Sequence, residues 1–344
     1  MQAIDPRIRA FGWVRPASLA VLVVLCLSGA GSVWGEAVSK RLEIVNGCDE
    51  PIWIFYQVGS GGGRLAAPNQ HKLAAKGDSI AYDIPDKGLA GTRFWPGMGC
   101  DEAGHDCTIG QSGGPASDGF SCPPTVGCAP PIDSKFEGTF GCLPSVPERD
   151  CQKNPSGSGV LPRADGWDTS MVDGYTLPYK LRVTPPAGQV CTAAPENNVI
   201  DCAALTMDAC PSDEDLSSNG KYPDLAHQDL VLHVPDEDGA ATTAVAGCLA
   251  PCTKLTAANW QSLPHPPFNG KTYRPADPQA ADYCCPTPPF SADACRKGPA
   301  AGTDYVKRIH QDCPNAYAYA YDDVEGNFRC PAGTVYTMTF YCDD

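Results

Sequence analysis

Short runs of β-branched and aromatic residues recur through the first part of the chain. They lie at residues 42–46, 52–56, 79–84 and 92–95, and clusters of turn-forming residues such as Gly59-Ser-Gly-Gly-Gly separate them. Runs of this length between turn signals are typical of strands. Their spacing predicts an antiparallel β-sandwich.

The strand pattern stops and then returns. Between Cys100 and Cys128, four cysteines occupy 29 positions among Gly, Pro and Asp, so a disulfide-held loop is expected there. Further strands are predicted over residues 136–140, 167–172, 179–184, 316–321 and 334–341. Because the last two follow a long cysteine-rich stretch, the β unit should be discontinuous in sequence.

That stretch, from Cys191 to Cys313, favours short helices and loops. One helix is predicted near residues 202–210 and another over 304–311, where Tyr305, Val306 and Ile309 fall on one helical face. Two long inserts interrupt the region, one acidic and one rich in Pro and Ala, and both are expected to be surface loops. They span residues 211–247 and 253–283.

Two carboxylates stand out at the end of the predicted strand 167–172. Asp168 and Asp173 are five residues apart, which would place them on opposite faces of a straight strand. They can share a site only if the strand ends or bulges between them. The Asp173-Gly174 pair, a common turn sequence, permits this.

Residues 1–35 read as a secretory signal peptide. Arg7, Arg9 and Arg15 form a basic region, the apolar run 19–27 follows, and a small residue, Gly35, ends the segment. The apolar run is too short for a comfortable membrane span, and no second long one follows. The mature chain is therefore expected to be secreted, extracellular and without a membrane span.

Charge and cysteine content agree with that compartment. Without residues 1–35, the chain has 22 basic and 39 acidic residues, a formal charge of −17. This balance argues against nucleic acid and anionic membranes as partners. Of 19 cysteines only Cys26 lies in the leader, and the even remainder of 18 predicts a disulfide framework whose connectivity stays open. The six histidines are scattered, so no metal and no cofactor is predicted.

Four stretches together resemble the thaumatin-like proteins, also known as osmotins or pathogenesis-related class 5 proteins. They are Ile44-Val-Asn-Gly-Cys, Gly91-Thr-Arg-Phe-Trp, Trp167-Asp-Thr-Ser-Met-Val-Asp-Gly-Tyr-Thr-Leu-Pro, and Tyr283-Cys-Cys with Cys313-Pro-Asn-Ala-Tyr-Ala-Tyr. The resemblance covers residues 41–344. It implies a mainly β fold: a flattened antiparallel β-sandwich, a disulfide-rich second domain with short helices, and a small looped third domain.

The resemblance also implies domain boundaries and disulfide pairs. The sandwich would comprise residues 36–102, 138–190 and 314–344, the looped domain 103–137, and the disulfide-rich domain 191–313. The family pattern implies the pairs Cys48–Cys342, Cys100–Cys107, Cys122–Cys128, Cys191–Cys330, Cys202–Cys313, Cys210–Cys248, Cys252–Cys284 and Cys285–Cys295. Cys142 and Cys151 remain and would form a ninth bridge.

Antifungal members of the family have an acidic cleft between the sandwich and the second domain, lined by one Arg, one Glu and three Asp. The counterparts in this chain are Arg93, Glu137, Asp168, Asp173 and Asp323. Carboxylates accept hydrogen bonds from sugar hydroxyls, and aromatic rings stack on sugar faces.

Four rings flank these positions and are candidates for such stacking: Trp95, Trp167, Tyr175 and Tyr321. The leading hypothesis is a secreted, monomeric, defence-type antifungal protein whose cleft binds β-1,3-glucan or a related cell-wall polysaccharide.

Two alternatives stay open. In the first, the protein is an endo-β-1,3-glucanase in which Glu137 is the general acid and Asp168 or Asp173 is the nucleophile or base. Arg93 would hold one of the aspartates ionised. In the second, the scaffold is a protein-interaction or inhibitor module whose inserts cover the cleft.

Overall fold

The computed structural model describes residues 38–59, 61–104, 107–110, 132–235, 241–256 and 270–342. The predicted signal peptide and the predicted pair Cys122–Cys128 lie outside these ranges. Residues Glu36–Asp344 form one compact unit. The division of that unit into three domains stays a prediction.

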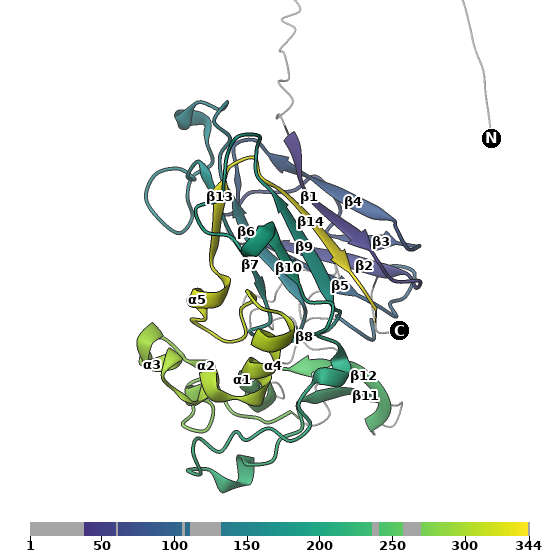
Figure 1. The fold of residues 1–344 in the computed structure, drawn as a ribbon, viewed down its shortest axis with the longest axis vertical. Coiled ribbons are helices and arrows are strands. Elements are labelled where there is room, and N and C mark those ends of the chain that lie inside the picture. Colours follow the sequence, from purple (N-terminus) through teal and green to yellow (C-terminus); the bar gives the residue numbers. More distant parts are fainter. Residues whose placement is uncertain are drawn as a thin grey trace, which may run out of the picture. The chain divides into compact units, whose positions relative to one another are not determined.

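Strands dominate this unit, and in its described part they form three sheets (Figure 1). The five-stranded sheet has the order β10 (Val199–Asp201), β9 (Tyr179–Thr184), β14 (Val335–Phe340), β1 (Val38–Asn46), β4 (Ser79–Pro85). The six-stranded sheet has the order β13 (Phe328–Pro331), β7 (Ala164–Ser170), β6 (Lys135–Phe140), β5 (Leu89–Gly97), β2 (Ile52–Val58), β3 (Gln70–Leu73). The smallest sheet has the order β11 (Val231–Pro235), β12 (Ala241–Leu249), β8 (Gly174–Tyr175).

The two large sheets pack face to face around one hydrophobic core, as the sequence predicts. On β14 the buried side chains alternate, with Tyr336, Met338 and Phe340 inside. The ring of Tyr336 lies 5.3 Å from that of Phe136 on β6 and 5.3 Å from that of Trp167 on β7. Alternate positions on strands of both sheets therefore meet in the core.

Pairing is antiparallel except between β1 and β14, which run parallel. Both strands lie inside the five-stranded sheet, and the disulfide Cys48–Cys342 joins the segments that follow them. The first and last described strands are therefore immediate neighbours.

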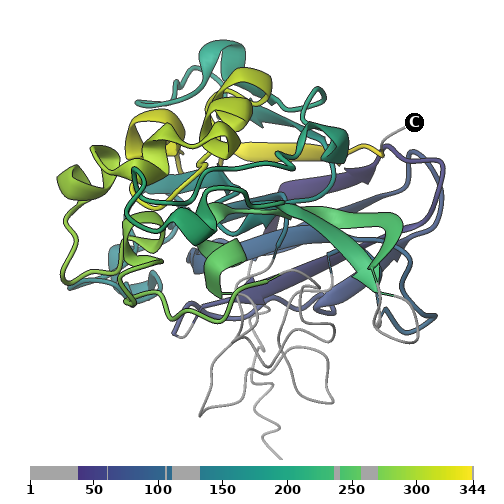
Figure 2. The same cartoon turned by 90° about the horizontal axis from the view of Figure 1, so that it is seen from below.

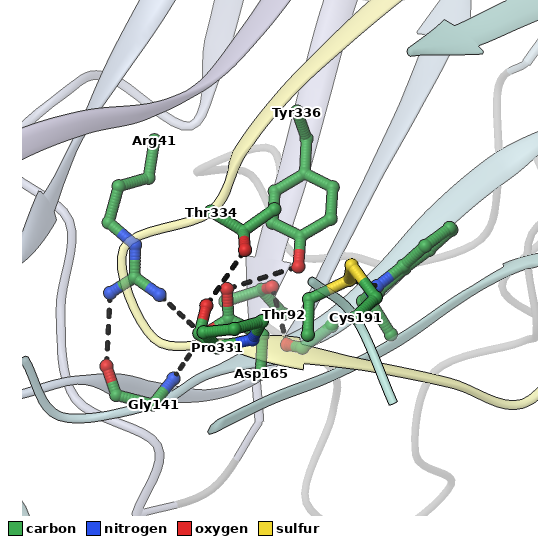
Figure 3. A network of polar contacts seen from close by, with 11 residues as sticks. Arg41, Thr92, Gly141, Asp165, Cys191, Pro331, Thr334 and Tyr336 are labelled. Carbon is green, nitrogen blue, oxygen red and sulfur yellow. Dashed lines mark hydrogen bonds and ion pairs between the residues drawn. A yellow bond between two sulfur atoms is a disulfide. The ribbon is translucent and has the colours of Figure 1, made fainter. Parts of the chain in front are cut away.

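A buried ion pair links the two large sheets (Figure 3). Arg41 on β1 and Asp165 on β7 are each 1% exposed, and the guanidinium Nη2 donates to the carboxylate Oδ1. The Gly141 amide donates to the same oxygen at 2.8 Å, and the Tyr336 hydroxyl donates to Oδ2 at 3.0 Å. The carboxylate is thus satisfied by three elements, as a buried charge requires.

The helices are short and gather with the β11–β12 hairpin at one end of the large sheets (Figures 1 and 2). They are α1 (Pro251–Thr256), α2 (Ala281–Cys284), α3 (Ala292–Arg296), α4 (Asp304–Asp312) and α5 (Asp323–Gly326). The 3-10 turns are η1 (Glu148–Asp150), η2 (Glu196–Asn198), η3 (Met207–Ala209), η4 (Pro223–Leu225) and η6 (Pro299–Gly302).

The helix predicted over 304–311 is confirmed as α4. Thr303 caps it by accepting a hydrogen bond from the Val306 amide at 3.3 Å, and Tyr305, Val306 and Ile309 are buried. The helix predicted near 202–210 is wrong, because that segment holds only the three-residue turn η3.

The strand predicted over 316–321 is also wrong. Tyr317 makes one isolated bridge with Ser170, and turns follow it. Ala316 and Ala318 are buried, which explains the alternating pattern. The segment therefore shows the alternating burial of a strand, but it is bridged to a neighbouring segment only at Tyr317 within the described residues.

The described parts of the two inserts contain regular structure, so the expectation of surface loops is wrong for them. Residues 211–247 contain β11 and part of β12, and the second insert contains most of α1 and part of α2. In the first insert, Glu214 is only 2% exposed. Its carboxylate accepts hydrogen bonds from the first two amides of α4, from Asp304 at 3.0 Å and Tyr305 at 2.8 Å. This satisfies two helix donors that would otherwise be unpaired.

Glu214→Ala is expected to lower the free energy of unfolding by about 1 to 2 kcal/mol, because it removes this cap inside the protein. Denaturant unfolding of the oxidised protein measures the loss. Asp213→Ala is the matched control, since that exposed carboxylate meets only the exposed His227. Equal losses for the two variants would contradict the role given to Glu214.

Eight disulfides lie within the described residues, in the pairs that the resemblance implies and with the additional pair Cys142–Cys151. The others are Cys48–Cys342, Cys100–Cys107, Cys191–Cys330, Cys202–Cys313, Cys210–Cys248, Cys252–Cys284 and Cys285–Cys295. Such a framework fits an extracellular protein. In the same part of the chain, no helix is long and apolar enough to cross a membrane.

Candidate functional site

Three charged residues form one row across neighbouring strands of the six-stranded sheet. Arg93 on β5 is opposite Glu137 on β6, and Glu137 is opposite Asp168 on β7. Directly opposite residues in an antiparallel pair have Cβ atoms about 4.5 to 5.5 Å apart and share a face.

Burial shows which face the row occupies. The residues beside the row, Phe94, Phe136 and Trp167, are at most 2% exposed and point into the core. Successive side chains on a strand point to opposite faces, so the charged row lies on the outer face of the sheet. Three strands, each with an inner aromatic residue, hold it in place.

Asp173 reaches the same face from a turn. Strand β7 ends at Ser170, two residues earlier than predicted. The Met171 amide then donates to the Tyr317 carbonyl at 2.8 Å, and the Gly174 amide donates to the Met171 carbonyl at 3.2 Å. Gly174 has φ of 143°, and a Cβ there would lie 2.4 Å from the Cys248 carbonyl oxygen. The turn at Asp173-Gly174 thus brings Asp173 to the same face of the sheet as Asp168, although the two residues are five positions apart.

These side chains line a cleft of about 330 Å³. Its lining residues are Arg93, Glu137, Asp168, Ser170, Val172, Asp173, Tyr317, Ala320 and Tyr321. Four of the five predicted site residues are therefore together.

The fifth, Asp323, does not line the cleft. It pairs with Arg296 at 2.6 Å and accepts a hydrogen bond from the Tyr317 hydroxyl at 2.7 Å. It is connected to the cleft through Tyr317 and through its charge, which raises the pKa of Asp168.

Two ion pairs organise the cleft, and neither was predicted. Arg93 Nε lies 2.6 Å from Glu137 Oε1, so Arg93 pairs with the glutamate and not with an aspartate. Lys135 Nζ lies 2.5 Å from Asp173 Oδ2. Lys135 precedes Glu137 by two residues on β6, so strand periodicity places both on one face. That signal was present in the sequence.

Asp168 differs from its neighbours. It is half-buried, and none of the hydrogen bonds or ion pairs found among the described residues reaches its carboxylate. Burial raises its pKa well above the usual range, the Glu137 carboxylate raises it further, and Lys135 and Arg93 oppose the rise. The site therefore favours the protonated form of Asp168.

Of the four candidate stacking rings, only Tyr321 lines the cleft. Trp95, Trp167 and Tyr175 are 5%, 2% and 0% exposed and belong to the interior. Tyr317, which the sequence did not single out, supplies the second ring of the cleft. In the described part of the chain, no group of three or more His, Cys, Asp or Glu is placed to hold a metal ion.

A buried carboxyl lies near the cleft. Asp133 is 0% exposed, and neither carboxyl oxygen has a hydrogen-bond partner in the part of the chain that the structure describes. Burial raises its pKa well above the usual range; Lys135 opposes this and Asp173 adds to it. A carboxyl with a raised pKa stabilises the fold below its unfolded pKa, and this contribution is lost as the pH rises through the folded pKa.

Asp133→Asn removes that loss, because the amide stays neutral at every pH. The variant is expected to match the wild type near pH 4 and to exceed its free energy of unfolding at pH 8 by about 1 to 3 kcal/mol. Denaturant unfolding across this pH range measures the difference. A difference that does not change with pH would contradict the assignment.

Comparison with known proteins confirms the resemblance seen in the sequence. The model of the Thaumatin family matches residues 272–342. A glucan endo-1,3-beta-glucosidase of Prunus avium is 27% identical over 330 residues, covering 93% of this chain and 98% of that protein. Thaumatin-like protein 1 of Pyrus pyrifolia is 27% identical over 326 residues, covering 94% and 98%. The resemblance to thaumatin-like proteins therefore rests on both comparisons, and these two relatives match the chain over nearly their full length.

Among solved structures, a laminaripentaose-producing beta-1,3-glucanase in complex with laminaritetraose is similar to 90% of this chain and 99% of its own. The identity is 13% and the TM-score 0.40, too low to bear on the fold or the activity.

Proposed function

We propose that the cleft binds β-1,3-glucan or a related cell-wall polysaccharide. The observation that carries this is the row of Arg93, Glu137 and Asp168 on one face, with Asp173 returned to it by the turn. Carboxyl oxygens at fixed spacing suit the hydroxyls of a sugar chain. Tyr317 and Tyr321 provide ring faces at the rim. The name of the Prunus avium relative supports the choice of glucan.

Binding is tested by co-sedimentation with insoluble β-1,3-glucan and by calorimetry with laminarin oligosaccharides. Glu137→Gln is expected to weaken binding about tenfold or more, because it removes a charged acceptor and leaves Arg93 without its partner. Asp201→Asn is the matched control, since that exposed carboxylate lies on the five-stranded sheet. If wild-type protein binds neither material, the polysaccharide proposal fails and a protein-interaction or inhibitor module takes its place.

The proposed setting is the one that the sequence indicates. We propose that the protein is exported by residues 1–35 and acts outside the cell as an antifungal, defence-type protein. Growth inhibition of fungal hyphae by the purified oxidised chain, with Glu137→Gln in parallel, tests this. Inhibition that survives the loss of glucan binding would separate the two activities.

A second candidate is hydrolysis of the bound glucan, and the electrostatics of the cleft favour it in a revised form. Asp168, with its raised pKa, would donate the proton to the leaving oxygen, and Glu137 beside Arg93 would be the nucleophile or base. Their cross-strand placement gives Cβ atoms about 4.5 to 5.5 Å apart, so both carboxyl groups can reach one bound sugar. Release of reducing sugar from laminarin by the wild type, lost in Glu137→Gln, tests the activity; binding without release would exclude it.

A further inference from the structure

Lys135 is an unusual residue for the outer face of a sheet. It lies on β6 beside Glu137 but is only 1% exposed. Its Nζ lies 2.5 Å from Asp173 Oδ2, while Asp173 itself is 21% exposed and lines the cleft. The buried lysine therefore meets an aspartate that a ligand in the cleft can reach.

The surroundings keep the ammonium charged and available to Asp173. Burial disfavours the charge, but Asp173 and Glu137 outweigh this effect, and the pKa of Lys135 is raised. The nearby Asp133 favours its neutral form, and among the described residues its carboxyl oxygens make no hydrogen bond.

The positive and negative charges of the cleft are consequently nearly balanced. Glu137 pairs with Arg93, Asp173 pairs with Lys135, and Asp168 favours its protonated form. The cleft presents several oxygen acceptors with little surplus negative charge. Such a site suits a neutral glycan and gives no electrostatic advantage to a cationic one.

We propose that Lys135 is a positioning and specificity-determining residue of the cleft: by holding Asp173 Oδ2 it aims the other oxygen at a ligand and cancels the charge that would attract cationic sugars. This rests on the proposed polysaccharide function. Within the described residues, Oδ2 is the Asp173 carboxylate oxygen that is hydrogen-bonded. Oδ1 is thus left for a sugar hydroxyl.

The test compares two soluble ligands by calorimetry at a mildly acidic pH: laminarin oligosaccharides, which are neutral, and glucosamine oligomers, which are cationic. Lys135→Met is expected to bind the neutral ligand about tenfold more weakly and the cationic ligand about tenfold more tightly. Lys135→Met combined with Asp173→Asn removes both charges and should return the cationic ligand to its wild-type affinity. A role in stability alone would weaken both ligands together.

Lys180→Met is the matched control, since it breaks an exposed ion pair with Asp201 on the other large sheet and should change neither affinity. Lys135→Arg keeps a cation and should keep the wild-type order of preference. If Lys135→Met does not fold, Lys135→Arg is measured in its place. A Lys135→Arg variant that reverses the wild-type preference between the neutral and the cationic ligand would overturn the proposal.

A measurement without ligand separates this proposal from the proposed function. The carboxyl carbon resonance of Asp173, assigned with Asp173→Asn, should move in Lys135→Met and stay in place in Lys180→Met. An unmoved resonance, or wild-type affinities for both ligands in Lys135→Met, overturns the role of Lys135. If the wild type binds no glycan but the resonance moves, the polysaccharide function fails while the positioning of Asp173 stands.

Discussion

Asp165→Asn is expected to lower the free energy of unfolding by about 3 to 5 kcal/mol, because it leaves the guanidinium of Arg41 buried without a counter-charge. Both side chains are 1% exposed, so water cannot compensate for the lost partner. The amide also fits poorly between the Arg41 guanidinium, the Gly141 amide and the Tyr336 hydroxyl, all donors to the carboxylate in the native protein. Guanidinium chloride unfolding at neutral pH, with the disulfides intact, measures the loss.

Two further variants test whether the loss of stability arises because the ion pair is buried. Asp201→Asn breaks the exposed pair with Lys180 and should cost less than about 1 kcal/mol. Arg41→Met combined with Asp165→Leu removes both buried charges and should recover much of the stability lost by Asp165→Asn. A loss below about 1 kcal/mol for Asp165→Asn would show that the pair is not buried in solution.

Asp168→Asn is expected to reduce laminarin hydrolysis about 10²- to 10⁴-fold if the cleft is catalytic, because the amide cannot deliver a proton to the leaving oxygen. The wild type should lose activity as the pH rises through the raised pKa of Asp168, since only the protonated carboxyl acts as acid. Binding of laminarin oligosaccharides should fall far less than turnover. Reducing-sugar assays from about pH 4 to pH 8 measure both effects.

A variant outside the cleft tests the same assignment independently. The Asp323 carboxylate raises the pKa of Asp168, although Asp323 does not line the cleft. Asp323→Asn should therefore retain activity and move its alkaline limit to lower pH. An unchanged alkaline limit would show that another group supplies the proton.

Strands were predicted correctly from the sequence where an alternating hydrophobic pattern coincides with a partner strand in the structure. The runs at 52–56 and 92–95 became β2 and β5. Tyr56 and Phe94 pack in the main core, and Trp53, Phe55 and Trp95 form a second buried cluster with Cys107. The segment 316–321 shows the limit of that signal. Ala316 and Ala318 are buried as in a strand, but periodicity cannot show whether a partner strand is present.

The acidic insert shows a second limit. Its charges indicated a solvated loop, yet Glu214 is buried because its partners are amides of α4, 90 residues away in the chain. A sequence pattern is local, and it does not reveal a cap supplied by a distant segment.

The candidate site was predictable in part. The family resemblance supplied Arg93, Glu137, Asp168 and Asp173, which line the cleft together. It could not supply the pair of Asp173 with Lys135, because Lys135 lies outside the matched motifs. Strand periodicity would have placed Lys135 beside Glu137, but it would not have shown that Lys135 is buried.

The parallel pairing of β1 with β14 has a consequence for the order of folding. The two strands are neighbours inside the five-stranded sheet, although the bridge beside them, Cys48–Cys342, spans 294 residues of sequence. Contacts of such long range form slowly, because a large loop must close before they contribute. During synthesis, β1 can pair with β4 but has an unpaired edge until β14 emerges. The core beneath this sheet therefore closes only once β14 has been made, and a chain truncated before β14 would leave that edge open to other chains.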